Sequence, residues 1–360
     1  MLLLFFKIIN FHSFYNFSFF WNFGFIIFFI FIIQVFSGII LSFYINFDLK
    51  YILISKIFLL NNISYGWFFL KIHCIFPNFI FLLIYLHIFK SLISFMFYPL
   101  KLFISGIFLY LFFIIVVFTG YSIAGGSMGY WAIIVVFNIL KYILGYEISS
   151  CIFFFDNIGV SSSTIFKLFS IHYLFSFFIF IFFFIHIFFL HDCGSSNNLQ
   201  PGYYDGFKFS CFIFFKDIFL LFLFLFFIIF LTFLNPSIFF ILGDNFVEIQ
   251  EFKSVEIVVE WYLRFFFIVL RAINSKFFGI FFTFILFLFL FFYPLNKDFF
   301  RFNYLISTFI LFLFLFFYNL ILFSWYFFSS YLYTIPFFIL LFFTIFNFII
   351  FNFYKFYYKF

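Results

Sequence analysis

Long apolar stretches dominate this sequence and set the class of fold that it can form. Eight runs are long enough to cross a membrane as helices, for which about 20 mostly apolar residues are needed. Membrane β-strands would be about ten residues long with alternating polarity. We therefore predict an all-α polytopic membrane protein with eight transmembrane helices, at residues 22–46, 65–90, 103–123, 166–190, 216–242, 276–293, 303–323 and 335–353.

The composition excludes the other broad classes of protein. Hydrophobic residues make up 68% of the chain and charged residues 8%, whereas a soluble domain carries about 25% charged residues. Such a chain cannot cover a water-facing surface, which argues against a soluble enzyme or a nucleic-acid-binding protein. The 18 lysines and arginines divide evenly between the two sides of the eight-span arrangement, so charge bias does not predict the orientation.

The histidines repeat one spacing inside two of the expected spans. His73 and His87 lie fourteen residues apart in the second span, and His172 and His186 lie fourteen apart in the fourth. Fourteen helical residues rise about 21 Å and return the side chain to nearly the same face. A lone buried histidine is often a packing residue, but two equal spacings predict two bis-histidine sites at two depths of the membrane.

Glycines repeat the same interval in the first and third spans. Gly24 and Gly38 lie fourteen residues apart, as do Gly106 and Gly120. Small residues often serve helix packing in membranes, but a missing side chain also lets a flat macrocycle approach the backbone. Together with the histidine pairs, these glycines favour two stacked haems. Two axial histidines leave no open position on the iron, which indicates electron transfer.

Several short motifs resemble those of mitochondrial cytochrome b, the haem-carrying core of the quinol–cytochrome c oxidoreductase (complex III). Besides the histidine pairs, they are WNFG at 21–24, TGY at 119–121, GSMGYW at 126–131, HDCGSSNN at 191–198, Lys216–Asp217, VEWY at 259–262 and Arg271. The motifs follow the family order. Val259 replaces a family proline and Leu70 a family arginine, so the chain is identified as a divergent member.

The resemblance implies which side chains would hold two non-covalent b-type haems. His73 and His172 would ligate the iron of a low-potential haem near the intermembrane side, and His87 and His186 that of a high-potential haem near the matrix. Lys90 and Lys167 would pair with haem propionates, or else extend to the membrane surface. The other side chains implied at the haems are Gly24, Gln34, Gly38, Lys90, Gly106, Gly120 and Lys167.

The resemblance also implies a site for ubiquinol oxidation near the low-potential haem. Glu260 would accept a proton there, because a carboxylate in an apolar cleft is suited to proton transfer near the working pH. A pairing of Glu260 with Arg264, one helical turn later, is the structural alternative. The expected wall of the site consists of Phe118, Tyr121, Met128, Ala132 and Tyr262.

A second site, for quinone reduction, is implied near the matrix beside the high-potential haem. Its expected residues are His191, Ser195, Lys216 and Asp217. A histidine can donate protons near neutral pH, which suits this role. The alternative is that these polar residues form a solvated loop at the membrane surface.

By the same resemblance, quinol would give one electron to a mobile Rieske iron–sulfur protein and one across the haems to quinone, coupled to proton translocation. The other implied partners are the cytochrome c1 subunit, further complex III subunits, a second copy in a homodimer and the lipid of the mitochondrial inner membrane. Residues 1–211 would form the four-helix dihaem bundle. Residues 212–360 would form a C-terminal membrane domain whose loop 243–275 carries the quinol site.

Other classes of membrane protein make different predictions. The plastid counterpart generally spaces its second histidine pair one residue wider and ends after four spans, and an unrelated dihaem anchor would lack VEWY and the glycine spacing. Both are disfavoured. A haem-free transporter or channel, with histidines lining a polar path, is the alternative function, and the absence of haem absorbance would favour it.

Overall fold

The computed structural model describes most of the first two thirds of the chain. The described residues are 12–14, 21–93, 100–144, 160–194, 206–208 and 213–234, with short pieces between 260 and 284. The chain divides into two compact units, residues 1–135 with 152–256, and residues 136–151 with 257–360. The first unit contains almost all of the described helices, and the fold and both histidine pairs are described within it.

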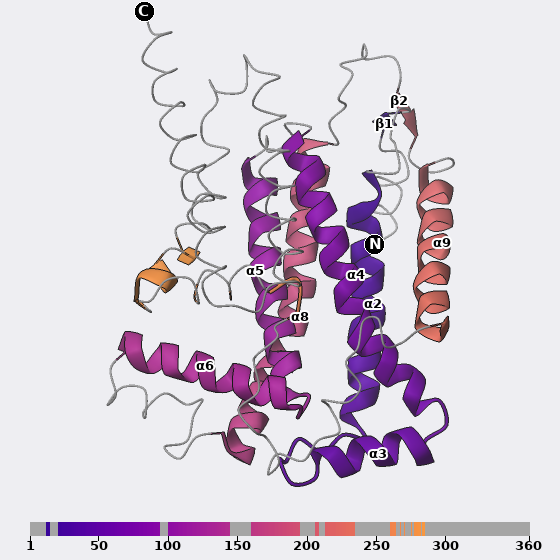
Figure 1. The fold of residues 1–360 in the computed structure, drawn as a ribbon. Helices are drawn as coiled ribbons and strands as arrows, with labels where there is room; N and C mark the ends of the chain where they lie inside the picture. The colour runs from indigo at the N-terminus through magenta and orange to yellow at the C-terminus, as the bar shows by residue number, and fades with distance from the viewer. Residues whose placement is uncertain are drawn as a thin grey trace, which may run out of the picture. The chain divides into compact units, whose positions relative to one another are not determined.

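Four long helices form the first unit's central bundle (Figure 1). Helix α2 (Phe23–Ser42) packs along α4 (Gly66–Ile93), and α5 (Leu100–Ile123) packs along α8 (Ser162–Cys193). A fifth long helix, α9 (Ile213–Leu234), contacts α2 and α4. All five are apolar and long enough to cross a membrane. They confirm the all-α membrane class and coincide with the first five expected spans.

The expected spans 303–323 and 335–353 lie outside the described residues, and 276–293 is described only in part. The structure also contains a short antiparallel ribbon, which the apolar pattern does not predict. Strand β1 (His12–Phe14) pairs with β2 (Gly206–Lys208), with His12 opposite Lys208. The ribbon joins segments that are almost two hundred residues apart in the sequence.

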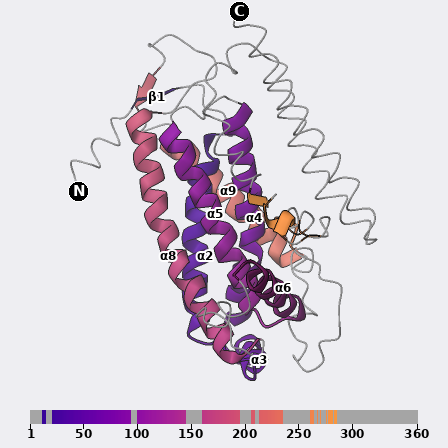
Figure 2. The same ribbon diagram turned by 90° about the vertical axis from the view of Figure 1, so that its left-hand side faces the viewer.

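An aromatic layer fills the middle of the four-helix bundle, which Figure 2 shows turned by 90°. Phe31 of α2 meets Phe113 of α5 with ring centroids 5.2 Å apart in an edge-to-face arrangement, a preferred geometry for aromatic pairs. Both rings are almost fully buried. Each lies seven residues from the two glycines of its own helix, so the layer separates the two expected haem levels.

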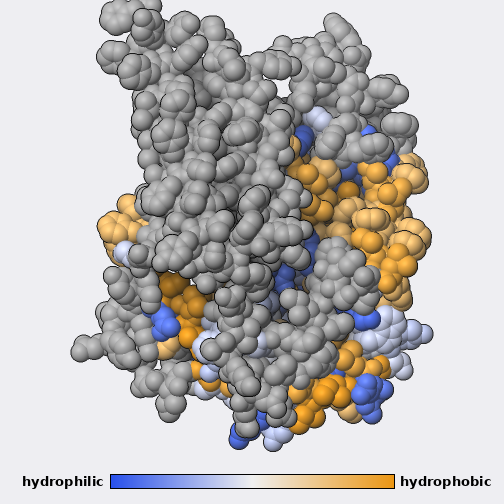
Figure 3. Space-filling model, in the orientation of Figure 1, coloured by the Kyte–Doolittle hydropathy of each residue, from blue (hydrophilic) through white to orange (hydrophobic). Residues whose placement is uncertain are grey.

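The outward faces of the bundle are apolar as well. Phe188 of α8 and Phe226 of α9 are 66% and 72% exposed, and Figure 3 shows a hydrophobic surface on the right, where α9 lies. A soluble protein rarely exposes a continuous apolar surface of this size. This surface is suited to contact with lipid, in agreement with a multi-pass membrane protein.

A short helix, α3 (Ile52–Asn62), lies across the lower end of the bundle in Figure 1. Its buried Lys56 donates a hydrogen bond to the carbonyl of Ala124. Gly125 follows with φ +74°, and a Cβ there would lie 2.7 Å from Cγ2 of Ile52. Helix α3 therefore packs closely on the turn that leads from α5 into α6 (Ser127–Leu144).

The loop before α3 is tied to the start of α8. Asp48 accepts hydrogen bonds from the backbone N–H of Lys50 at 3.0 Å and from the hydroxyl of Ser162 at 2.8 Å. These two bonds, in that order, lower the pKa of Asp48 below its usual 3.8. Phe47 stacks on Phe169 with ring centroids 4.0 Å apart. Helix α8 itself begins with a reciprocal capping box between Ser161 and Thr164, a motif that satisfies free backbone N–H groups.

Candidate functional site

The structure brings together, near the lower end of the bundle, the first histidine of each fourteen-residue spacing. His73 of α4 faces His172 of α8, with ring centroids 6.3 Å apart and ring planes at 79°. We call His73 and His172 the lower pair. Opposite His73 lies Gly38 of α2, where an added Cβ would stand 2.8 Å from Cε1 of the imidazole. Opposite His172 lies Gly120 of α5, where the corresponding distance would be 2.7 Å.

His87 and His186 lie fourteen residues further along the same two helices, a rise of about 21 Å, and each again lies against a glycine. We call His87 and His186 the upper pair. A Cβ at Gly24 would lie 3.3 Å from Cε1 of His87, and one at Gly106 would lie 3.1 Å from Cε1 of His186. Every glycine of the fourteen-residue spacing therefore lies against the imidazole of one histidine. The expected levels, Gly38 and Gly120 with one pair and Gly24 and Gly106 with the other, agree with this geometry.

Hydrogen bonds from neighbouring helices orient three of the four imidazoles. Nδ1 of His73 lies 3.0 Å from Oγ of Ser37 and 3.1 Å from the carbonyl of Gln34. Ser37 donates its own proton to the Gln34 carbonyl. Its oxygen is thus free to accept from Nδ1–H. A proton on Nδ1 leaves the lone pair of Nε2 available to a metal, a common arrangement for metal-binding histidines.

The same arrangement recurs on α5. Nδ1 of His172 lies 2.8 Å from the carbonyl of Val116 and 3.3 Å from Oγ1 of Thr119. Nδ1 of His186 lies 2.8 Å from Oγ of Ser105. Sequence reasoning missed these hydroxyl residues. The available signal was a polar residue directly before a glycine of the fourteen-residue spacing, inside an otherwise apolar span.

The spacing of the lower pair suits a metal ion held between the two imidazoles. A point midway between the rings lies half of 6.3 Å from each centroid, so that a ring nitrogen on either side could reach the same metal. The described residues contain no group of three or more metal-binding side chains. Two imidazoles facing each other therefore suit a metal whose other ligands come from a macrocycle, and the glycines leave room for its close approach.

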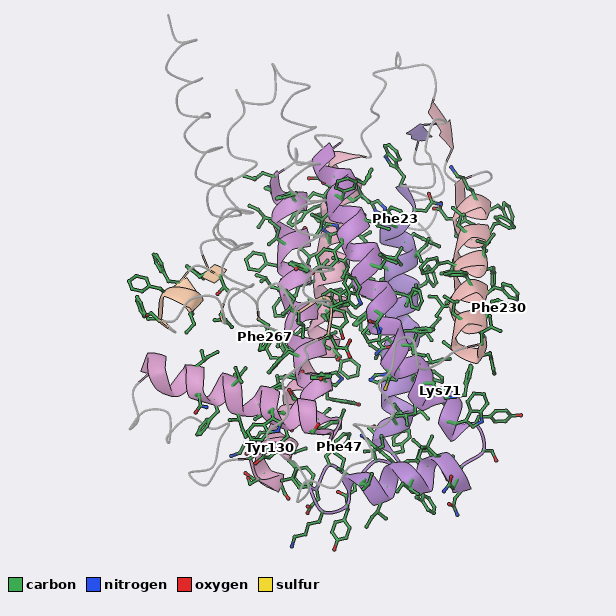
Figure 4. All side chains as sticks on the ribbon, in the orientation of Figure 1. Phe23, Phe47, Lys71, Tyr130, Phe230 and Phe267 are labelled. Atoms are coloured by element: carbon green, nitrogen blue, oxygen red, sulfur yellow. The ribbon has the colours of Figure 1, made fainter. Side chains whose placement is uncertain are left out.

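The cationic residues expected at the haems have other neighbours in the structure. The ammonium of Lys90 lies 4.1 Å from the ring centre of Trp21. Leu70, at the position of the missing arginine, is buried against Leu41 and Leu59. Lys71, labelled near the lower end of α4 in Figure 4, lies over Trp67 at 5.2 Å.

Gln34 and Lys167 are the other two residues expected beside the propionates. The amide of Gln34 donates to the carbonyl of His73 at 2.8 Å, so this side chain joins α2 to α4. Lys167 is half-buried near the start of α8. Contact of either residue with a propionate stays a prediction.

Three of the four residues expected at the quinone-reduction site are described by the structure, and a common site stays a prediction. Asp217 of α9 is buried and accepts a hydrogen bond of 2.5 Å from the amide of Asn22, at the start of α2. Asn22 is a further residue that sequence reasoning missed. Lys216 is the half-buried neighbour of Asp217, and His191 is exposed near the end of α8. Ser195 lies outside the described residues.

The expected quinol-oxidation residues are distributed over both compact units. Phe118 and Tyr121 lie on the last turns of α5, and Ala132 is buried on α6. The side chain of Met128 is not described. Glu260 and the buried Tyr262 belong to the second unit, where the carbonyl of Glu260 accepts from the N–H of Leu263. A common site formed by these residues stays a prediction.

The fold defines a class of protein, a multi-pass membrane bundle in which two pairs of histidines lie at two depths, each imidazole against a glycine. A family model described as cytochrome b/b6/petB matches residues 8–194. Cytochrome b of Schizosaccharomyces japonicus is 30% identical over 285 residues, covering 76% of this chain and 70% of that protein. Cytochrome b of Caenorhabditis elegans is 31% identical over 259 residues, covering 69% and 67%. The chain therefore belongs to the cytochrome b family.

A solved structure supports the fold assignment. A chain of a hyperthermophilic respiratory complex III matches with a TM-score of 0.73 at 23% identity, covering 80% of this chain and 78% of that one. At this identity the likeness shows a shared fold. The resemblance noted from the sequence motifs is thus confirmed at the level of family and fold.

Proposed function

We propose that this chain is the core haem subunit of a respiratory complex III. The observation that supports this best is the repeated geometry of the two histidine pairs, each imidazole lying against a glycine. His73 and His172 would hold one b-type haem, and His87 and His186 the other. When bound, these groups supply one-electron transfer between the two ends of the bundle, which links quinol oxidation at one end to quinone reduction at the other.

The protein's own residues would prepare the bundle for this chemistry. Ser37, Ser105 and Thr119 would accept hydrogen bonds from Nδ1–H of their histidines, which would leave Nε2 available to a haem iron. Phe31 and Phe113 fill the space between the two levels and exclude water. A dry, low-dielectric interior strengthens the effect of each fixed charge and hydrogen bond on the groups held there.

The lower end of the bundle would carry quinol oxidation. Glu260 would accept a proton from quinol, and the wall would be formed by Phe118, Tyr121, Met128, Ala132 and Tyr262. The close packing of α3 on the turn after α5 supports this placement, because Lys56 and Ile52 fix the turn between Tyr121 and Ala132. Binding energy used to orient a substrate depends on such fixed walls.

The upper end would carry quinone reduction. The pair of buried polar side chains, Asn22 and Asp217, supports this placement, because a carboxyl group in an apolar setting is suited to giving or taking a proton. Lys216, His191 and Ser195 would complete the route by which protons arrive. The lower end would face the intermembrane space and the upper end the matrix.

The remaining parts of this proposal concern the assembly. The chain would reside in the mitochondrial inner membrane, a location suggested by its eukaryotic relatives. It would use ubiquinol, deliver one electron to a Rieske iron–sulfur protein, and assemble with a cytochrome c1 subunit, further subunits and a second copy of itself. The whole cycle would move protons across the membrane.

The first test is a reduced-minus-oxidised spectrum of the purified complex with quantitation of pyridine haem. We expect two b-type haems per chain. Replacing His73 or His172 with leucine should remove the lower haem, and replacing His87 or His186 should remove the upper one. The variant His191→Gln serves as the matched control and should retain both haems. A wild-type complex without b-type haem would contradict the proposal and favour a haem-free transporter.

A further inference from the structure

Three of the four glycines that face a histidine directly follow a serine or threonine, and the fourth follows a phenylalanine. Ser37 precedes Gly38, Ser105 precedes Gly106 and Thr119 precedes Gly120. Each of these hydroxyls lies within 3.3 Å of Nδ1 of the facing histidine. Phe23, labelled near the upper end of α2 in Figure 4, precedes Gly24 and has no hydroxyl to offer.

His87, the histidine that faces Gly24, is the exception among the four imidazoles. Its Nδ1 is buried and has no hydrogen-bond partner within the part of the chain that the structure describes. The lower pair therefore has two imidazoles with hydrogen-bonded Nδ1 atoms, whereas the upper pair has one, His186. A buried polar atom without a partner is uncommon in native proteins and calls for an explanation.

The start of α2 accounts for this difference. In the lower pair, Nδ1 also meets a backbone carbonyl four residues before the facing glycine, that of Gln34 for His73 and that of Val116 for His172. Helix α2 begins at Phe23, so Gly24 is its second residue, and the position four residues earlier lies outside the described part of the chain. Among the described residues, neither the hydroxyl nor the helical carbonyl of the repeated pattern is thus present at His87.

We infer that this missing hydrogen bond raises the reduction potential of the upper haem relative to the lower one. The inference rests on the proposed function. A hydrogen bond from Nδ1–H makes the imidazole a more basic ligand, which stabilises the oxidised iron and lowers its potential. Both histidines of the lower haem would carry this hydrogen bond, whereas only one histidine of the upper haem would. Phe23 is therefore a positioning residue, which acts through His87, and it favours electron flow from the lower to the upper level.

The test restores the hydroxyl at the one position where it is missing. Phe23 lies fourteen residues before Ser37 on the same helix, so a serine at position 23 would face His87 as Ser37 faces His73. The variant Phe23→Ser should favour the oxidised form of the upper haem by about threefold to tenfold, or roughly 30–59 mV, since 59 mV is tenfold for one electron. The lower haem should keep its potential. Both potentials are read from haem absorbance in the purified complex at controlled electrode potentials.

The matched control is Phe23→Ala, which removes the ring without adding a hydroxyl. The potential of the upper haem should therefore be lower in Phe23→Ser than in Phe23→Ala. Equal potentials in these two variants would overturn the inference, as would a shift confined to the lower haem. In both cases two haems are still present and the proposed function stands, whereas a wild-type complex without haem would remove both.

A second variant keeps the inference testable if position 23 does not tolerate a small residue. Ser37→Ala removes one of the two acceptors of His73 Nδ1 and leaves the Gln34 carbonyl as the other. The potential of the lower haem should then rise, by less than the shift expected for Phe23→Ser because one hydrogen bond remains, and the difference between the two haems should narrow. An unchanged difference between the two potentials would count against the inference.

Discussion

Gly120 of α5 lies directly against the imidazole of His172 on α8, so that a Cβ at position 120 would stand 2.7 Å from Cε1 of the ring. Real Cβ atoms essentially never approach another heavy atom so closely. The neighbouring imidazole is held by the carbonyl of Val116 and the hydroxyl of Thr119, so it cannot turn aside without losing those bonds.

Gly120→Ala should therefore displace His172 and remove or weaken the lower haem, at a cost of about 1–3 kcal/mol for overpacking. Gly24→Ala is the graded control, because a Cβ there would lie 3.3 Å from His87 and requires a smaller adjustment. Haem content per chain measures both variants. A loss of haem from Gly24→Ala equal to that from Gly120→Ala would contradict the geometric explanation.

Phe31→Ala should destabilise the bundle through the aromatic layer. The ring is 2% exposed and contacts Phe113 and Phe183 at centroid distances of 5.2 and 5.7 Å. Its removal leaves a cavity between the two levels, with an expected loss of about 3 kcal/mol in the free energy of unfolding. Phe188→Ala, at a position 66% exposed, should change stability by less than about 0.5 kcal/mol. Thermal loss of haem absorbance compares the two variants.

Two substitutions at Asp217 should separate its contribution to stability from its role with protons. Asp217→Leu leaves the buried amide of Asn22 without its acceptor, which should cost about 1–3 kcal/mol of stability. Asp217→Asn keeps an oxygen for Asn22 but cannot exchange a proton, so stability should hold while quinone reduction slows by about a hundredfold. The rate at which quinone reoxidises the upper haem measures the second effect. Normal rates in Asp217→Asn would exclude Asp217 as a proton donor.

The contribution of Asp48 to stability should depend on pH in one direction only. Because the folded-state pKa of Asp48 lies below 3.8, its bonds to Lys50 and Ser162 contribute fully above that value. The contribution is lost as the pH falls through the folded-state pKa. The difference in stability between the wild-type protein and Asp48→Asn should therefore become smaller only below about pH 4. Unfolding temperatures measured from pH 8 downwards check this, and a difference that already narrows between pH 8 and 6 would contradict it.

The sequence by itself determined the membrane class, the first five spans and the two fourteen-residue spacings. These features depend on the hydropathy and helical period of single segments, and both can be read from a local stretch of sequence. The short helix α3 and the ribbon between β1 and β2 were not predicted. Helix α3 is shorter than a span and includes a charged residue, and the ribbon pairs strands of three residues each.

Only the tertiary structure decided which glycine lies against which histidine, and which side chains hold each Nδ1. Gly38 meets His73 because α2 packs on α4, and Gly120 meets His172 because α5 packs on α8. The pairs Ser105–His186 and Asn22–Asp217 join residues 81 and 195 positions apart. Local sequence preferences carry no information about such contacts, since these arise only when separate helices pack in one register. For the same reason, the unsatisfied Nδ1 of His87 could be recognised only in the folded bundle.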